Sequence, residues 1–182
     1  MIYKFLRPND PILKSRLQEV SFDTFEDMYH LTPTQLYENL LETMTSCGGI
    51  GLSANQCGVM VRMFVMYTDW DNKIHEPFFN PEIIWESDNQ IVFSEGCLTY
   101  PFLFLDINRP YEIEVKYQDI EGIEYQKKLS GIPARVFQHE YDHMEGKNFT
   151  QLVSPLKLDI GKRKAAKALK KQKIKQKNAR NT

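Results

Sequence analysis

Two histidines four residues apart, with a glutamate beside the first, have the clearest spacing for chemistry in this chain. They belong to residues 138–143, which read Q-H-E-Y-D-H. Because a helix brings positions i and i+4 onto one face, His139 and His143 would project together. Two such imidazoles can hold a divalent metal ion, and Glu140, offset around the helix, can reach water at that ion. The spacing therefore predicts a metal site with a base beside it.

The segment around these histidines also carries helix signals. Pro133 suits a first helical turn, where its missing N–H is not needed, and Gly146 suits the left-handed residue after a last turn. Ile132 and Val136 fall on the same face as the histidines. We therefore expect a helix with an inward apolar stripe that ends in two imidazoles.

Two histidines alone leave two interpretations open. They could be half-buried helix residues without a metal, because catalytic sites of this kind usually have three protein ligands and a water. Cys97 is the candidate third ligand, since it follows Gly96, which permits an unusual backbone, and precedes an N–H that could face the same cavity. A single cysteine is more often a small buried apolar residue, so this ligand is a hypothesis.

Length and composition set the class of protein. With 182 residues, 42% of them hydrophobic, the chain predicts one domain with a core of its own. Its apolar runs are too short to cross a bilayer, and its first residues do not form a secretory signal. Three cysteines without C-x-x-C spacing indicate a reducing compartment. We expect a cytoplasmic protein of bacterial type, or one of an organellar stroma or matrix, neither secreted nor in a membrane.

The charge divides the chain into two parts. Residues 157–182 carry eleven Lys or Arg and one acid, whereas residues 1–156 carry a net charge of −11. We expect a single folded domain over 1–156 and a lysine-rich tail over 157–182, helical or disordered. The apolar stripe of that tail is thin, so a helix there would not be held by packing.

The remaining pattern predicts an α+β fold. A helix begins at the capping box of Thr32 and Gln35, with Pro33 in the first helical position, and is ended by Gly48 and Gly49. A short helical piece is expected over 12–20. Buried or alternating runs predict strands, and polar pairs predict turns. The expected strands are 59–67, 83–85, 90–93, 112–117 and 123–129, and the expected turns are 69–72, 80–81 and 119–122. Strands that precede the motif helix favour antiparallel sheets packed around it.

Three motifs resemble those of the peptide deformylase family. Residues 49–56 (G-I-G-L-S-A-N-Q) are similar to G-x-G-L-A-A-x-Q, residues 95–99 (E-G-C-L-T) to E-G-C-L-S, and residues 138–143 to Q-H-E-x-D-H. The resemblance covers about residues 1–155, and 132–143 looks most like the organellar and cyanobacterial-like type I branch. It implies a deformylase-like fold and a metal-dependent hydrolase that removes formyl from N-formyl-methionyl nascent peptides and releases formate.

The resemblance also implies roles for single residues. Cys97, His139 and His143 would bind one divalent metal, with Glu140 as general base. Donors to the oxyanion would be the Gln56 amide and the Leu98 N–H. The substrate-binding candidates are Ile50, Gly51, Phe93, Glu95, Gly96, Ile132 and Val136. Of these, Ile50, Phe93, Ile132 and Val136 would form the walls of a methionine pocket, and each of the four could equally be a core residue. The resemblance implies Fe2+ in the cell, while the ligand types also permit Zn2+, Ni2+ or Co2+.

Some positions depart from the family pattern. Ser53 and Thr99 are mild changes, but Phe104 stands where many bacterial members have an arginine that helps to hold the peptide backbone. The tail lies outside the resemblance. Its lysines could be solvated, or could dock on RNA phosphates, for which the ribosome is the natural target of a deformylase.

Other functions fit less well. The motif of residues 49–51 lacks the third glycine of a dinucleotide site, so no nucleotide cofactor is expected. A zincin peptidase needs a further ligand downstream, but no histidine follows His143. An RNA-binding protein with a structural metal core is the remaining alternative. It would keep its activity when Glu140 becomes glutamine, whereas a deformylase would lose it.

Overall fold

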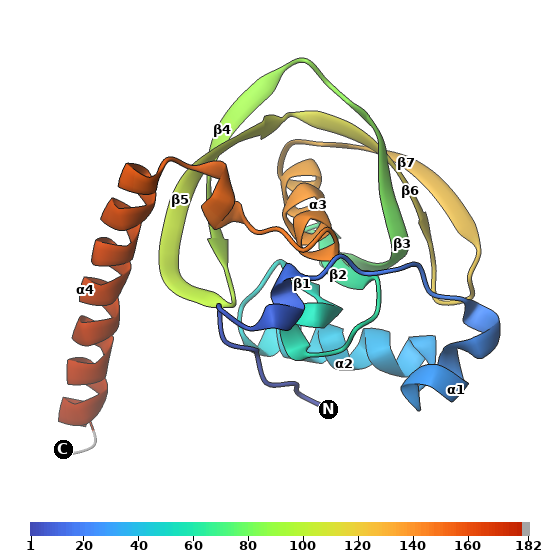
Figure 1. Ribbon diagram of the computed structural model, residues 1–182, viewed down its shortest axis with the longest axis horizontal. Helices are drawn as coiled ribbons and strands as arrows, with labels where there is room; N and C mark the ends of the chain where they lie inside the picture. The colour runs from blue at the N-terminus through green and yellow to red at the C-terminus, as the bar shows by residue number, and fades with distance from the viewer. Residues whose placement is uncertain (180–182) are drawn as a thin grey trace.

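Helix α3 (Gly131–Met144), which carries both histidines, lies in the middle of the molecule with strands on several sides (Figure 1). The computed structural model describes residues 1–179. Pro133 lies in the first turn of α3, and the helix ends just before Gly146, whose φ is 68°. The start and end expected from the sequence are therefore confirmed.

Five antiparallel strands form the larger sheet, in the order β1-β2-β3-β6-β7. Their bounds are β1 Gly51–Ser53, β2 Met63–Asp69, β3 Ile74–Glu86, β6 Glu112–Gln118 and β7 Glu124–Ser130. The alternation expected for β6 is confirmed, because Ile113, Val115 and Tyr117 are buried. They share one core with Phe137 of α3, which fixes the helix against the sheet.

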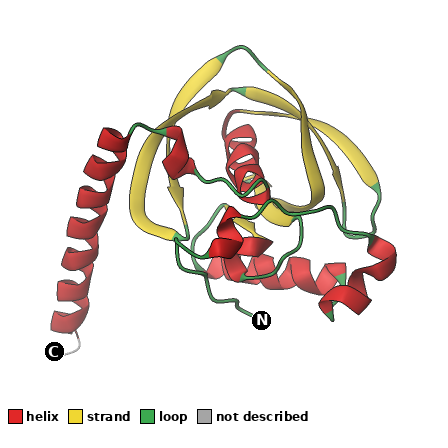
Figure 2. Cartoon of the chain, in the orientation of Figure 1, coloured by secondary structure: helices red, strands yellow, loops and turns green. Residues whose placement is uncertain are grey.

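Two further strands form a separate hairpin, β4 (Gln90–Cys97) and β5 (Tyr100–Pro110). The sequence prediction contained only the first half of β4 and missed β5. Alternate residues of β5 are buried, and Leu103, Leu105 and Ile107 pack against Phe149 in a core of their own. Both sheets are antiparallel and surround α3, so the expected α+β architecture is confirmed (Figure 2).

The helices outside the sheets cover the base of the molecule. Helix α2 (Pro33–Ser46) begins at the expected capping box, in which Thr32 Oγ1 accepts from the Gln35 N–H at 3.1 Å. Its apolar face packs in a second core with β1 and β2. Helix α1 (Phe25–Tyr29) was not predicted. Four short 3-10 helices are η1 Pro11–Lys14, η2 Phe22–Thr24, η3 Ala54–Cys57 and η4 Phe149–Leu152.

Two local predictions were wrong. The turn expected at 80–81 is an irregularity inside β3, where Asn80 has a φ of 46° and the register shifts between Phe79 and Glu82. The Asn80 side chain bonds both the N–H and the carbonyl of Val20, which explains why a turn-forming residue occurs in a strand. The helical piece expected over 12–20 is limited to η1.

Helix α4 (Pro155–Ala179) contains most of the lysine-rich tail and lies beside β5 (Figure 1). Leu158 and Ala165 pack against the β5 core, and Gly161 is buried. The expectation that packing would not hold this helix is therefore wrong for its first turns. Residues 180–182 of the tail lie outside the described residues. Within 1–179, no helix has the length and apolar character needed to cross a membrane.

Candidate active site

One cavity of about 510 Å3 collects nearly all the residues that the sequence singled out. It opens between β1, the β4–β5 hairpin and α3. The predicted site residues in its lining are Ile50, Gly51, Gln56, Phe93, Glu95, Gly96, Cys97, Leu98, Ile132, Val136, His139 and Glu140. His143 lies behind the wall, only 1% exposed.

A thiol and two imidazoles converge at the inner end of this cavity. Cys97 comes from the end of β4, and His139 and His143 come from adjacent turns of α3. The ligand atoms of the three side chains all lie within 4.8 Å of one another. Because these elements are remote in sequence, only the tertiary fold brings the three groups together.

The separation of these groups fits a tetrahedral cation site. Cys97 Sγ lies 3.5 Å from His143 Nε2. Bonds of about 2.3 Å to sulfur and about 2.05 Å to nitrogen, at a tetrahedral angle, separate the two ligand atoms by about 3.6 Å. The residues present therefore fit a divalent metal without rearrangement of the backbone.

A buried carboxylate orients one of the two imidazoles. Glu95 Oε2 lies 3.0 Å from His139 Nδ1, so the N–H of the ring is directed to the carboxylate and Nε2 is left as a ligand atom. Arg109 donates to the same carboxylate at 2.7 and 3.0 Å, and Arg135 donates to it at 2.9 Å. Arg109 also reaches Asp142 at 2.8 Å, which ties the network to α3.

The pKa values of the two histidines indicate where positive charge is favoured. Burial lowers the pKa of His139, but hydrogen bonds to Cys97 and Glu95 outweigh it and raise the pKa to about 10. Burial, together with the charges of His139 and Arg109, holds the pKa of His143 well below its ordinary value. The environment thus stabilises a cation between the thiol and the carboxylate. A metal ion would take the place of that proton.

Glu140 lies against β1 beside the cluster. Its Oε2 is buried and has no hydrogen-bond partner among the described residues. Burial raises the pKa of Glu140 to about 7. A Cβ added to Gly51 would lie 2.6 Å from Glu140 Oε1 and 2.7 Å from Val136 Cγ1, so only glycine leaves room for this carboxylate. Such a group can accept and return a proton near neutral pH.

The amide of Gln56 has a fixed orientation. Its Oε1 accepts from the backbone N–H and the hydroxyl of Ser53 at 3.0 and 2.9 Å. The NH2 end is therefore directed the other way, to Cys97 Sγ at 3.2 Å and Thr99 Oγ1 at 2.9 Å. Leu98 lies in the turn after Cys97 and lines the same cavity.

The predicted pocket residues occupy different depths. Val136 is buried, as expected, but Ile132 is 51% exposed at the rim. The buried apolar face of α3 therefore begins one turn later than expected and does not include Ile132. Glu95 lines the cavity, yet its carboxylate is bonded to two arginines and His139. A direct bond from Glu95 to a substrate would therefore have to displace one of these partners.

The sequence analysis missed the two arginines. Arg109 follows Leu103, Leu105 and Ile107 at period two, which would have indicated a buried arginine and hence an acidic partner. Arg135 lies one helical turn before His139, on the face that carries the ligands. The signal at Arg109 depends on β5, a strand that the sequence did not predict, whereas Arg135 lies in a predicted helix but outside the three motifs.

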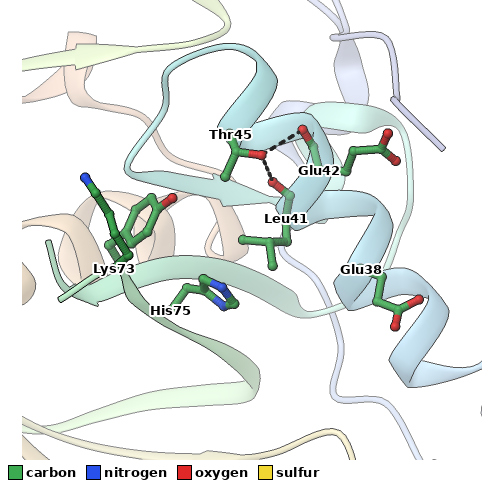
Figure 3. Close-up of a pocket in the computed structure, with 7 residues that line it drawn as sticks. Glu38, Leu41, Glu42, Thr45, Lys73 and His75 are labelled. Atoms are coloured by element: carbon green, nitrogen blue, oxygen red, sulfur yellow. Dashed lines mark hydrogen bonds between the residues drawn. The ribbon is translucent and has the colours of Figure 1, made fainter.

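A second hollow, of about 380 Å3, lies between α2 and the β2–β3 hairpin (Figure 3). Glu38, Glu42 and Lys73 supply charges of both signs, and His75 lines the same hollow. Thr45 of the same wall donates to backbone carbonyls of its own helix. None of the described residues that line it belongs to the metal cluster. The chemistry of this chain is therefore concentrated in the larger cavity.

Known proteins share this sequence pattern. The pattern of the polypeptide deformylase family matches residues 2–159. A peptide deformylase of Pseudothermotoga lettingae is 37% identical over 153 residues, covering 84% of this chain and 84% of that protein. One from Christiangramia forsetii is 35% identical over 181 residues, covering 91% and 89%.

The fold is shared as well. The crystal structure of a peptide deformylase from Legionella pneumophila superposes with a TM-score of 0.82 at 32% identity, covering 94% of this chain and 98% of that chain. The enzyme from Thermotoga maritima gives 0.76 at 36% identity, covering 85% and 99%. In sequence and in fold alike, this chain belongs to the polypeptide deformylase family, metal-dependent hydrolases that remove the formyl group from nascent peptides.

Proposed function

We propose that this deformylase works in the larger cavity, with Cys97, His139 and His143 as the ligands of one divalent metal ion. The observation that carries the proposal is the convergence of a thiol and two imidazoles within 4.8 Å, beside the buried carboxylate of Glu140. When bound, the metal supplies Lewis acidity and lowers the pKa of water toward neutrality. Fe2+ is the ion we propose in the cell, and the ligand set also accepts Zn2+, Ni2+ or Co2+.

Side chains and one backbone N–H of the cavity carry out the proton transfers and stabilise the oxyanion. Glu140 takes a proton from water as the water attacks the formyl carbon, and its raised pKa suits that transfer at neutral pH. The Leu98 N–H donates to the oxyanion that forms, and the Gln56 NH2 group donates to it in exchange for its bond to Cys97 Sγ, each worth about 3 kcal/mol. Glu140 then returns the proton to the leaving nitrogen. The products are formate and a peptide with a free amino terminus.

The peptide substrate has a natural place between the two sheets. β1 is the edge strand of the larger sheet, β4 has a free edge, and Gly51 and Gly96 line the cavity from them. An extended peptide can pair with such edges through its backbone. The methionine side chain would then enter the cavity among Ile50, Phe93 and Val136, with Ile132 at the rim.

Glu95 takes a different role from the one expected. Its bonds to Arg109, Arg135 and His139 favour a positioning residue, one that acts through the imidazole and does not touch substrate.

Helix α4 is proposed as a docking element for ribosomal RNA, appended to a catalytic unit of residues 1–156. The sequence places eleven basic residues and one acid in residues 157–182. Its first turns pack on β5, so the helix would hold the basic residues from Lys157 to Lys175 at a fixed place relative to the cavity. Phosphate contacts of this kind are strongly salt dependent.

A reducing compartment suits this site. The three cysteines are unpaired, and the proposed ligand Cys97 must remain a thiolate. We therefore propose that the protein is located in a bacterial cytoplasm or in an organellar stroma or matrix.

The decisive variant is Glu140→Gln, assayed with the peptide formyl-Met-Ala-Ser in the metal-loaded protein. Formate release should fall by at least about 100-fold, because the general base is lost. Metal content, measured in the same samples, should be unchanged, because Glu140 is not a ligand. Full formate release by the variant would exclude Glu140 as the general base. Absence of formate release from the metal-loaded wild type would instead favour the alternative of a structural metal in an RNA-binding protein.

A further inference from the structure

The rim of the cavity contains an aromatic side chain that neither the metal site nor the methionine pocket uses. Phe104 lies on β5, and its neighbours Leu103 and Leu105 are buried in the β5 core. Phe104 itself is 64% exposed, although it lines the cavity. Because strand residues alternate between faces, the packing of its two neighbours keeps Phe104 on the open face.

The ring of Phe104 lies directly on the backbone of β4. Gly96 is its partner across the hairpin, and a Cβ there would lie 2.7 Å from Phe104 Cε1 and 3.0 Å from Cδ1. Because Gly96 has no side chain, the Phe104 ring can occupy the space in which a Cβ would lie. Since Gly96 immediately precedes Cys97, this ring is held one residue from the proposed metal site.

The surroundings of Phe104 are apolar. Pro101 and Phe102 line the cavity next to it, and Phe102 has a φ of 64°, an uncommon conformation for a residue with a side chain. Among the described residues of the lining, the basic ones are Arg135 and His139, and both are buried and bonded to Glu95. The rim thus offers an aromatic contact and no free positive charge.

We infer that Phe104, with Phe102 beside it, is a specificity-determining residue that favours nascent peptides with an aromatic or large apolar side chain soon after formyl-methionine. The inference rests on the proposed peptide site between β1 and β4. A peptide with its methionine in the cavity must leave past this rim, where an exposed apolar surface is buried by an apolar side chain. Phe104 does not reach the reacting atoms, so its effect belongs to KM.

The test compares formyl-Met-Ala-Ser with formyl-Met-Phe-Ser and formyl-Met-Ala-Phe in the full-length, metal-loaded enzyme. At least one phenylalanine peptide should have a kcat/KM about fivefold higher, through a lower KM, the size expected of an aromatic contact. In Phe104→Ala this ratio should fall to about one. Phe104→Tyr, which keeps the ring, should restore it.

Val92→Ala is the matched control, because Val92 is exposed on β4 but does not line the cavity. It should keep the wild-type ratio. The inference is overturned if neither phenylalanine peptide gains over the reference, or if the gain persists in Phe104→Ala. Failure of the wild-type enzyme to turn over formyl-Met-Ala-Ser would instead count against the proposed function, so the two failures are distinguishable.

Discussion

At the scale of single residues, Glu140 is buried, and its Oε2 has no hydrogen-bond partner among the described residues. Its pKa rises from 4.5 to about 7 because burial disfavours the charged form. Such a rise costs stability whenever the group is ionised. A carboxylate kept here at that cost is consistent with a role in proton transfer.

The sign of this effect predicts a pH dependence. Because the pKa is higher in the folded protein, the contribution of Glu140 to stability is complete below about pH 4.5 and is lost as the pH rises through about 7. The free energy of unfolding of metal-free wild type should therefore fall by about 3 kcal/mol relative to Glu140→Gln between pH 4.5 and 8. Urea unfolding in the presence of a chelator measures it.

The groups around Glu140 do not obscure this comparison. His139 keeps its proton up to a pKa of about 10, and Glu95 is ionised because its pKa is held at about 2. Both charges are therefore constant over the range. An identical pH dependence in wild type and variant would show that Glu140 is not the titrating group.

Glu95 leads to a second prediction at this scale. Its carboxylate fixes the ring of His139, so Glu95→Gln should weaken metal affinity about 10- to 100-fold, as loss of such a partner does at other metal sites. Competition with a chelator measures the affinity, and unfolding curves verify that the variant is folded. Glu112→Gln, which neutralises an exposed acid on β6, is the control. Equal affinity in both variants would leave Glu95 without the proposed role.

At the scale of elements, the contact between α4 and β5 depends on one glycine. A Cβ at Gly161 would lie 2.7 Å from Leu105 Cδ2 and 3.0 Å from Leu103 Cδ1. Gly161→Leu should separate the helix from the strand and lower the free energy of unfolding by about 2 kcal/mol, as overpacking does. Ala166→Leu adds bulk on the exposed side of the same helix and should have little effect. Equal urea midpoints for both variants would contradict this packing.

The elements found from the sequence are those with local signals. Three such signals are the capping box of α2, the alternation of buried and exposed residues in β6, and the proline and glycine at the ends of α3. Each depends on only a few neighbouring residues, and each is confirmed. β5 was missed because its apolar alternation follows directly on the C-terminal motif of β4 and contains a proline at each end. The turn at 80–81 was wrong because a contact with Val20, sixty residues away, holds Asn80 in the strand.

The candidate site was easier to predict than the residues that support it. Cys97, His139 and His143 belong to recognisable motifs, and the fold brings them together. Arg109 and Arg135 have no motif, and they gain a role only through bonds to Glu95 across the hairpin and the helix. The roles of the pocket residues and the narrower resemblance to the organellar branch stay predictions.

At the scale of the whole molecule, charge is divided between a negative body and a positive helix. Deleting residues 157–182 would be a poor test of docking, because the first turns of α4 cover part of the β5 core. Lys170→Gln/Lys171→Gln removes two charges beyond that contact. This variant should reduce the salt slope of ribosome binding by about 1 to 2, since each phosphate contact contributes about 0.7 to 0.9.

The control for this prediction is Lys4→Gln/Lys14→Gln, which makes the same change in net charge with two exposed lysines of the body. Sedimentation with ribosomes at several salt concentrations compares the two variants. The same slope in both would mean that total charge, and not α4, governs binding.

The distance in sequence between the thiol and the imidazoles also sets an order of events during synthesis. Cys97 precedes His139 by 42 residues, and β5, β6 and β7 lie between them. At about 5 to 20 residues per second, the sulfur leaves the ribosome about 2 to 8 seconds before the first ring. During this interval the thiol has no imidazole with which to share a cation. A cell must therefore deliver the metal late, to an almost finished polypeptide.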